Sequence, residues 1–245
     1  MKLVISGGTG FVATELIRQS LNNPRITSVL ALARRPVDVP QNLGPKSDSG
    51  KLKSVVVQDF DQYPEDVKKQ LEGADACIWT LAITPTKSKS MPWDEVKRVC
   101  HNYTMSGLQA IFEARGTSTS TPLRFLYMSG IAAERDQTKT PRFMAQYSLM
   151  RGETENQVLA FAASHPEQID ASVAKPGLIL QPGSIFHWLR ATLLWWMASV
   201  PSISVVEISA AMLEQVLDGF EKDPLMNDDL ARIGQKALQS SNNRN

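Results

Sequence analysis

Short apolar runs alternate along this chain with stretches in which apolar residues recur at helical spacing. The apolar runs predict buried strands at residues 3–5, 26–33, 52–58, 74–81, 124–128 and 169–175. Helical spacing predicts helices over residues 11–21, 64–71, 93–114 and 147–164. Polar stretches rich in Pro, Gly, Ser or Thr, at residues 36–50 and 116–122, predict surface loops.

The regular alternation of strands and helices predicts one parallel sheet with helices on both faces, a doubly wound α/β fold. No internal repeat or linker divides the chain, and one α/β domain can reach its length of 245 residues. We therefore expect a single domain over residues 1–239 and a polar, disordered tail over residues 240–245.

Composition and charge narrow the function classes. Charged residues make up 21% of the chain and the formal net charge is +1, which gives no support for nucleic-acid binding. Cys77 and Cys100 are too few for a disulfide framework and lack metal-ligand spacing, so we expect a reducing compartment and no metal. Neither a signal peptide nor an apolar run of about 18 residues is present, and we expect a cytoplasmic protein.

A glycine-rich turn separates the first predicted strand from the first predicted helix, with the sequence Gly7-Gly8-Thr9-Gly10-Phe11-Val12-Ala13. Gly7 allows a tight turn, Gly10 lets the backbone approach a pyrophosphate, and Ala13 lets the helix pack closely on the strand. The helix N-terminus adds unpaired N–H groups and a partial positive charge. We therefore predict a Rossmann-type dinucleotide site; a turn kept only for packing is the alternative.

The residue type after the second predicted strand indicates which dinucleotide binds. An NAD site usually has Asp or Glu there to bind the ribose 2′-OH. This chain has Arg34 and Arg35, and a guanidinium matches a 2′-phosphate instead. We therefore predict NADP(H) in preference to NAD, the alternative being two solvated surface arginines.

Residues after the next two strands extend the predicted cofactor site. Asp59 follows the third strand, where it could hydrogen-bond the adenine; capping a helix is the alternative. Thr80 and Leu81 lie at the end of the fourth strand, and we expect them along the ribose side of the cofactor.

Tyr147 and Arg151 are four residues apart at the start of a predicted helix, so both side chains lie on one face. A tyrosine beside a cation can donate a proton to a carbonyl or accept one. In these features the chain resembles the short-chain dehydrogenase/reductase family along nearly its whole length. The matching positions are Gly7 to Phe11, Arg34, Arg35, Asp59, Asn102, Ser129, Tyr147 and Lys175-Pro176-Gly177.

The chain is more similar to an atypical branch of that family, the Tat-interacting-protein-type oxidoreductases and their fungal mitochondrial-surface relatives. Residues 147–155 resemble that branch's Tyr-x-x-x-Lys-Gly-x-x-Glu motif, residues 175–180 its Arg-Pro-Gly strand end, and residues 205–213 its late helix. The resemblance implies an NADPH-dependent oxidoreductase.

The resemblance also implies roles for single residues. Tyr147 would donate the proton, Arg151 would hold the ribose and bias the tyrosine, Ser129 would polarise the carbonyl, and Asn102 would hold a relay water. The strand end formed by Pro176, Gly177 and Leu178 would meet the nicotinamide, with main-chain groups near Gly177 holding its carboxamide.

Two positions depart from the family pattern. Arg151 replaces the lysine, which keeps the charge on a longer, planar side chain. Ser129 aligns with the first of the family's small hydroxyl residues, so that Gly130 and Ile131 fill the usual catalytic positions. A serine that only closes the strand and a Tyr147 that only packs at the helix start are the alternatives.

A late apolar stretch carries Trp188, Trp195 and Trp196. It lies within a segment of about residues 178–206 that the resemblance makes substrate-facing. Large aromatic residues there would form an apolar pocket or lid for a small substrate. A helix that rests on a membrane surface or partner, and a core helix, are the alternatives.

Together these observations predict an NADPH-dependent oxidoreductase that moves a hydride to or from the carbonyl or alcohol of an apolar small molecule. Two alternatives stay open: a non-redox isomerase, cyclase or lyase that uses Tyr147 as acid–base, and a catalytically weak NADPH-binding regulatory module. A homodimer, peripheral membrane contact and a place on the mitochondrial outer surface are further expectations that the family permits.

Overall fold

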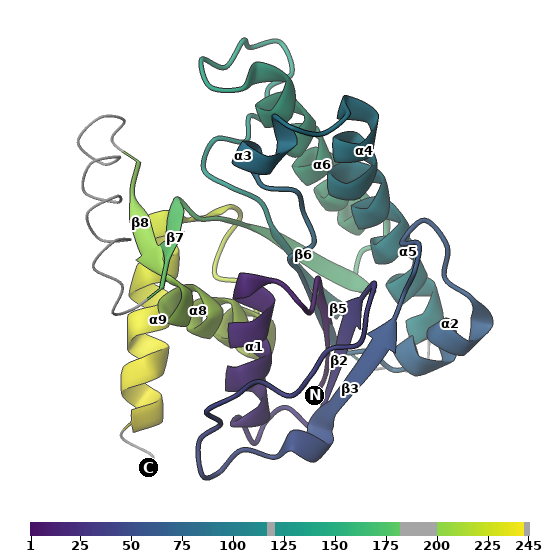
Figure 1. Ribbon diagram of the computed structural model, residues 1–245, viewed down its shortest axis with the longest axis vertical. Helices are drawn as coiled ribbons and strands as arrows, with labels where there is room; N and C mark the ends of the chain where they lie inside the picture. The colour runs from purple at the N-terminus through teal and green to yellow at the C-terminus, as the bar shows by residue number, and fades with distance from the viewer. Residues whose placement is uncertain (117–120, 182–199, 243–245) are drawn as a thin grey trace.

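The computed structural model describes residues 1–116, 121–181 and 200–242. In them, seven strands form one sheet in the order β3-β2-β1-β4-β5-β6-β9, and every neighbouring pair is parallel (Figure 1). These strands are β1 (Lys2–Ser6), β2 (Ser28–Ala33), β3 (Leu52–Val56), β4 (Ala76–Trp79), β5 (Leu123–Met128), β6 (Ile169–Lys175) and β9 (Leu225–Met226). A separate parallel pair joins β7 (Leu178–Leu180) to β8 (Ser202–Ser204).

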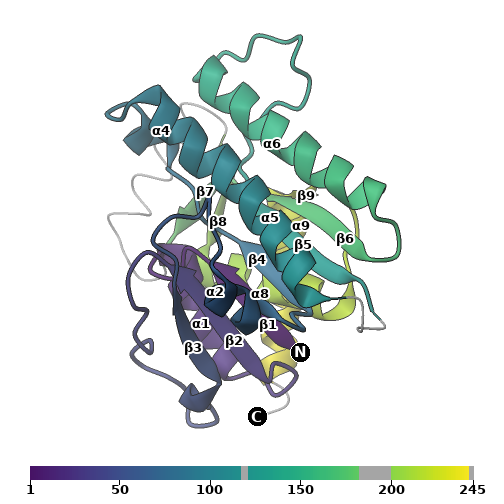
Figure 2. The ribbon, with the colours of Figure 1, turned by 90° about the vertical axis from the view of Figure 1, so that its right-hand side faces the viewer.

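Helices cover both faces of the sheet (Figures 1 and 2). One face carries α1 (Phe11–Leu21), α8 (Val205–Asp218) and α9 (Asn227–Asn242), and the other carries α2 (Glu65–Leu71), α5 (Tyr103–Arg115) and α6 (Ala145–Ser164). Three short helices, η1 (Ser49–Lys51), α3 (Pro85–Ser88) and α4 (Trp93–Lys97), and the π-helix η2 (Arg98–Asn102) complete the described elements.

The period of two in a strand divides the core into two layers. On β1, Val4 packs in the cluster under α2, α5 and α6, while Leu3 and Ile5 pack in the cluster under α1, α8 and α9. Because both faces of β1 are buried, its residues 3–5 form a continuous apolar run rather than an alternating pattern. The doubly wound α/β fold predicted from the sequence is confirmed.

Two predictions about single segments need correction. The helix expected over residues 93–114 is divided by the π-helical turn of η2, so that it is α4, η2 and α5. Residues 240–242, expected in a disordered tail, are the last residues of α9. The segment 178–206 begins with β7 and ends with β8 and the start of α8, and its substrate-facing role stays a prediction. The predictions for Trp188, Trp195 and Trp196 lie outside the described residues.

The sheet order reverses between β1 and β4, because the chain builds outward from β1 first toward β3 and then toward β9. Ser6, the buried last residue of β1, joins these two strands. Its hydroxyl accepts hydrogen bonds from the Thr80 and Leu81 backbone, and its carbonyl accepts one from the Thr80 hydroxyl at 2.6 Å. Ligands of doubly wound sheets bind beside this switch point, at the carboxyl ends of the strands.

Candidate cofactor and active site

A cavity of about 450 Å³ lies at the carboxyl edge of the sheet, beside the switch point. That volume falls in the range of small-molecule sites. Its lining comes from the turn after β1, the end of β2, the residue Phe60 after β3, and the segment from β4 into α3. The lining residues are Gly7, Thr9, Gly10, Ala33, Arg34, Arg35, Phe60, Thr80, Leu81, Ala82 and Lys87.

The glycine turn has the geometry that phosphate binding needs. Gly7 has φ +69°, a left-handed conformation that a side chain would strain, and a Cβ there would lie 3.2 Å from the Leu81 Cα. The first turn of α1 has no acidic residue, and Gly10, the N-cap, has no side chain to satisfy its N–H groups. These N–H groups, which include those of Phe11 and Val12, are available to an anion, because helix N-termini leave donors unpaired. The residues present therefore fit a pyrophosphate.

Arg34 and Arg35 are exposed at the cavity, and neither guanidinium has a hydrogen bond or ion pair to a described residue. Asp59 does not line the cavity, although its neighbour Phe60 does. The Asp59 carboxylate accepts from the Asp61 backbone, which lowers the pKa of Asp59, and forms an ion pair with Arg98 at 2.8 Å. Asp59 therefore holds the turn after β3 and does not cap α2, whose N-cap is Pro64. The contact of Asp59 with the adenine stays a prediction.

Tyr147 lies near the start of α6 and is 9% exposed. Its hydroxyl donates a hydrogen bond of 2.7 Å to the Ile83 carbonyl, in the segment between β4 and α3. Burial raises the pKa of this hydroxyl, and the positive charge of Arg151 opposes the rise only in part. Tyr147 is therefore a protonated donor at neutral pH, and it is not a lining residue of the described cavity.

Arg151 lies one helical turn beyond Tyr147, on the same face of α6 as expected, but its side chain enters the core and is 4% exposed. Its Nη2 donates to the Met128 carbonyl at 2.7 Å, and its guanidinium carbon lies 5.0 Å from the centre of the Tyr127 ring. The guanidinium faces the core in this structure, so the expected contact of Arg151 with the cofactor ribose is not formed by this conformation of the side chain. The guanidinium instead packs α6 on β5 and places a positive charge near Tyr147.

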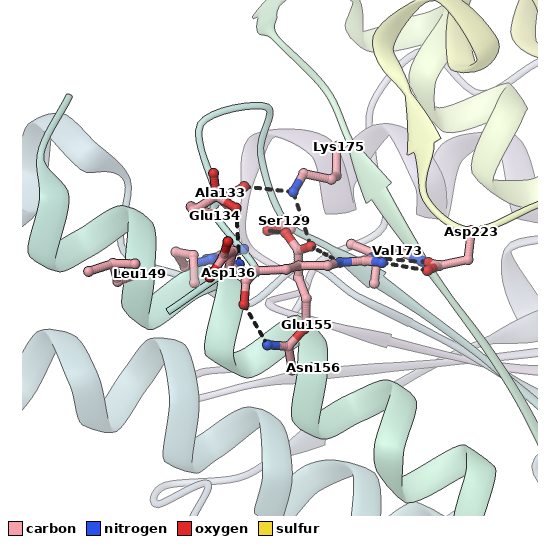
Figure 3. A network of polar contacts seen from close by, with 12 residues as sticks. Ser129, Ala133, Glu134, Asp136, Leu149, Glu155, Asn156, Val173, Lys175 and Asp223 are labelled. Carbon is pink, nitrogen blue, oxygen red and sulfur yellow. Dashed lines mark hydrogen bonds and ion pairs between the residues drawn. The ribbon is translucent and has the colours of Figure 1, made fainter. Parts of the chain in front are cut away.

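Ser129, at the end of β5, belongs to a buried polar network around Glu155 (Figure 3). Its hydroxyl donates to Glu155 Oε1 at 2.6 Å, while Arg135 Nε and Lys175 Nζ lie 2.7 and 3.1 Å from Glu155 Oε2. Glu155 is fully buried, and Asp223 pairs with the outer side of Arg135. The expected carbonyl-polarising role of Ser129 conflicts with this geometry, since its proton is committed to a carboxylate.

Asn102 and the residues after β6 are the remaining expected positions. Asn102 is exposed at the end of η2, and its role in holding a relay water stays a prediction. After β6, the Gly177 N–H donates to Asn227 Oδ1 at 3.0 Å and the Leu178 N–H to the Pro201 carbonyl at 2.9 Å. The Pro176 carbonyl accepts from the Ile131 backbone. These N–H groups already have partners, so they are not free to hold a carboxamide.

The sequence interpretation missed several residues of the site. Ser6 and Phe60 lie just beyond the predicted strands 3–5 and 52–58 and belong to no motif that indicates a site. A local signal could have placed Lys87, because Thr84-Pro85 is a typical helix start. It predicts a short helix that follows β4 and carries Lys87. The Glu155 network joins residues 20 to 26 positions apart and on different elements, and no local pattern indicates such a pairing.

Comparisons with known proteins agree with the fold and the sequence resemblance. No family model matches the chain. Protein FMP52, mitochondrial, from Candida albicans is 22% identical over 259 residues, which cover 95% of this chain and 98% of that protein. Among solved structures, a double mutant of the dTDP-glucose 4,6-dehydratase DesIV from Streptomyces venezuelae, with NAD bound, is similar with a TM-score of 0.67 and 15% identity. That match covers 98% of this chain and 81% of the enzyme.

Vestitone reductase from alfalfa is similar with a TM-score of 0.65 and 18% identity over 92% of this chain and 76% of that enzyme. These similarities show the Rossmann-type fold. Together with the fungal relative, they fit the resemblance of the sequence to the atypical short-chain dehydrogenase/reductases. In the described residues, no helix is long and apolar enough to cross a membrane, and no group of three metal-ligating side chains occurs.

The two halves of the site differ in how their polar groups are used. At the start of α1 the first N–H groups have no described partner, and Arg34 and Arg35 line the cavity without one. In the second half, the Tyr147 and Ser129 hydroxyls and the Gly177 N–H have partners within the protein. The Arg151 Nη2 is also paired, whereas its buried Nε has no partner among the described residues. Chemically, the first half can bind a phosphate-rich ligand, and the second offers one protonated hydroxyl, that of Tyr147.

Proposed function

We propose that this chain binds NADP(H) and is an oxidoreductase that acts on the carbonyl or alcohol of an apolar small molecule. The observation that carries the proposal is the cavity at the switch point, where the glycine turn and two unpaired arginines meet. A bound nicotinamide cofactor would supply or accept the hydride. The alfalfa reductase and the NAD-bound dehydratase, which share the fold, support this class of chemistry.

Each residue of the proposed site then has a defined role. The turn from Gly7 to Gly10 and the start of α1 hold the pyrophosphate, and Arg34 and Arg35 bind the 2′-phosphate. Phe60 gives an apolar wall. Tyr147 donates its proton to the substrate oxygen as charge develops there, and its raised pKa keeps that proton in place at neutral pH.

Two measurements test this function. Calorimetric titration with NADPH and with NADH should show binding of both, with NADPH tighter by about tenfold or more, since a phosphate–arginine pair contributes about 1.5–3 kcal/mol. Oxidation of NADPH with a panel of apolar carbonyl compounds, followed at 340 nm, should be abolished in Tyr147→Phe. A purified chain that binds neither nucleotide would overturn the proposal.

A second candidate function is an NADPH-binding regulatory module without turnover. Specific contacts favour it: Tyr147 donates to a main-chain carbonyl and Ser129 to Glu155, so neither hydroxyl is free for a substrate. In that case NADPH binds as expected, no carbonyl compound is reduced, and Tyr147→Phe leaves the affinity for NADPH unchanged.

A further inference from the structure

The cavity holds a third cation that lies on the wall opposite Arg34 and Arg35. Lys87 comes from α3, after β4, whereas the arginines follow β2, and β1 with its glycine turn lies between these strands. All three side chains line the same cavity of about 450 Å³. Two sides of the phosphate-binding turn therefore carry positive charge.

No carboxylate compensates this charge among the described lining residues. None of the three cations has an ion pair to a described residue, and Asp38, the nearest acidic residue along the chain to the arginines, does not line the cavity. Elsewhere in the described chain, arginines such as Arg18 and Arg98 lie against carboxylates. Three like charges gathered in one cavity are stabilised by an anion of more than one negative charge.

The backbone that carries Lys87 is held on both sides. Its N–H donates to the Thr84 hydroxyl, and its carbonyl accepts from the backbone and hydroxyl of Ser90 at 3.2 and 3.0 Å. Upstream, Ile83 is anchored by the Tyr147 hydroxyl and by Cys100 Sγ. The base of the lysine is thus positioned in advance, while its flexible stem can adjust to a ligand.

We propose that Lys87 is a specificity-determining residue that binds the cofactor's 2′-phosphate from the side opposite Arg34 and Arg35. This inference rests on the proposed NADP(H) site and assigns Lys87 a role within it. The pyrophosphate already has the glycine turn and the start of α1. A 2′-phosphate is a monoester with a charge of about −1.5 to −2 at pH 7 and three acceptor oxygens, so it can be bound by several cations at once. Lys87 offers these oxygens an ammonium donor from a different element of the cavity wall than the two arginines.

Titration of the Lys87→Gln variant tests this assignment. Calorimetry with NADPH and with adenosine 2′,5′-bisphosphate should show affinities about tenfold weaker than those of the native chain, because one charged contact is lost. Affinities for NADH and ADP, which lack the 2′-phosphate, should change by less than about twofold. Lys87→Arg should keep the preference for NADPH.

Lys89→Gln is the matched control, because Lys89 is an exposed lysine two residues further that does not line the cavity. It should leave all four affinities unchanged. If Lys87→Gln weakens NADH and ADP as much as NADPH, or weakens none of them, the assignment to the 2′-phosphate is overturned while the cofactor site stands. If the native chain binds neither NADPH nor NADH, the proposed function fails as well.

Discussion

Replacing Ser129 by alanine separates a structural from a catalytic serine. The substitution removes the 2.6 Å hydrogen bond to Glu155, whose carboxylate is fully buried. A hydrogen bond to a charged group contributes about 1.5–3 kcal/mol to stability. Because Arg135 and Lys175 still contact Glu155 in the variant, we expect a loss near the middle of that range, about 2 kcal/mol.

Ser172→Ala is the matched control for this prediction. Ser172 lies on the neighbouring strand β6 and donates to a neutral acceptor, the Lys222 carbonyl, at 2.8 Å. Its loss should cost about 1 kcal/mol, the usual contribution of a neutral hydrogen bond. Ser172 is 1% exposed and Ser129 is less buried, so burial alone would give the opposite order. The acceptor's charge therefore decides the result.

Urea denaturation of the three proteins measures these losses, and thermal unfolding should place Ser129→Ala about 4–8 °C below the native midpoint. Binding of NADPH should not change. Once a substrate is known, turnover of Ser129→Ala should stay within about threefold of the native rate, because removing a catalytic donor costs a hundredfold or more. A variant as stable as the native protein with a hundredfold lower rate would refute the structural role.

Three further predictions follow from the same contacts. Glu155→Gln should destabilise the fold by about 3–5 kcal/mol in urea denaturation, because the buried ammonium of Lys175 loses its counter-ion; a loss below about 1 kcal/mol contradicts the network. Gly7→Ala should weaken NADPH binding and lose about 1–2 kcal/mol of stability, whereas Gly73→Ala, with φ +65° in open space, should lose only stability. Because burial raises the pKa of Tyr147, the rate of carbonyl reduction should show no loss from Tyr147 ionisation between pH 7 and 9; a fall over that range while NADPH binding stays unchanged contradicts this.

The cofactor half of the site was predictable because its signals are local. A strand, a glycine turn and a helix follow one another within residues 2–21, and Arg34 directly follows β2. In a parallel sheet the residues after each strand meet at one edge, so their order along the chain already places them together. The structure accordingly puts Gly7, Gly10, Arg34 and Arg35 around one cavity.

The catalytic half was less predictable because side-chain partners come from distant elements. Tyr147 meets a carbonyl 64 residues earlier, and Ser129 meets a carboxylate 26 residues later. Spacing on α6 correctly put Tyr147 and Arg151 on one face, but it gave no information on whether that face meets the cavity or the core. The arginine is longer than the family's lysine, and it reaches the Met128 carbonyl beneath the helix.

The contacts of the Tyr147 and Ser129 hydroxyls also indicate which of them could take part in the reaction. To act on a substrate, Tyr147 must exchange one neutral hydrogen bond, to the Ile83 carbonyl, for another to the substrate oxygen. Such an exchange changes the free energy by about 1 kcal/mol or less, since each bond contributes a similar amount. Ser129 would have to leave a buried carboxylate and exchange a charge-assisted bond for a neutral one. We therefore expect Tyr147, acting without Ser129, to be the proton donor, in a reaction for which a single protonated hydroxyl beside a buried arginine is sufficient.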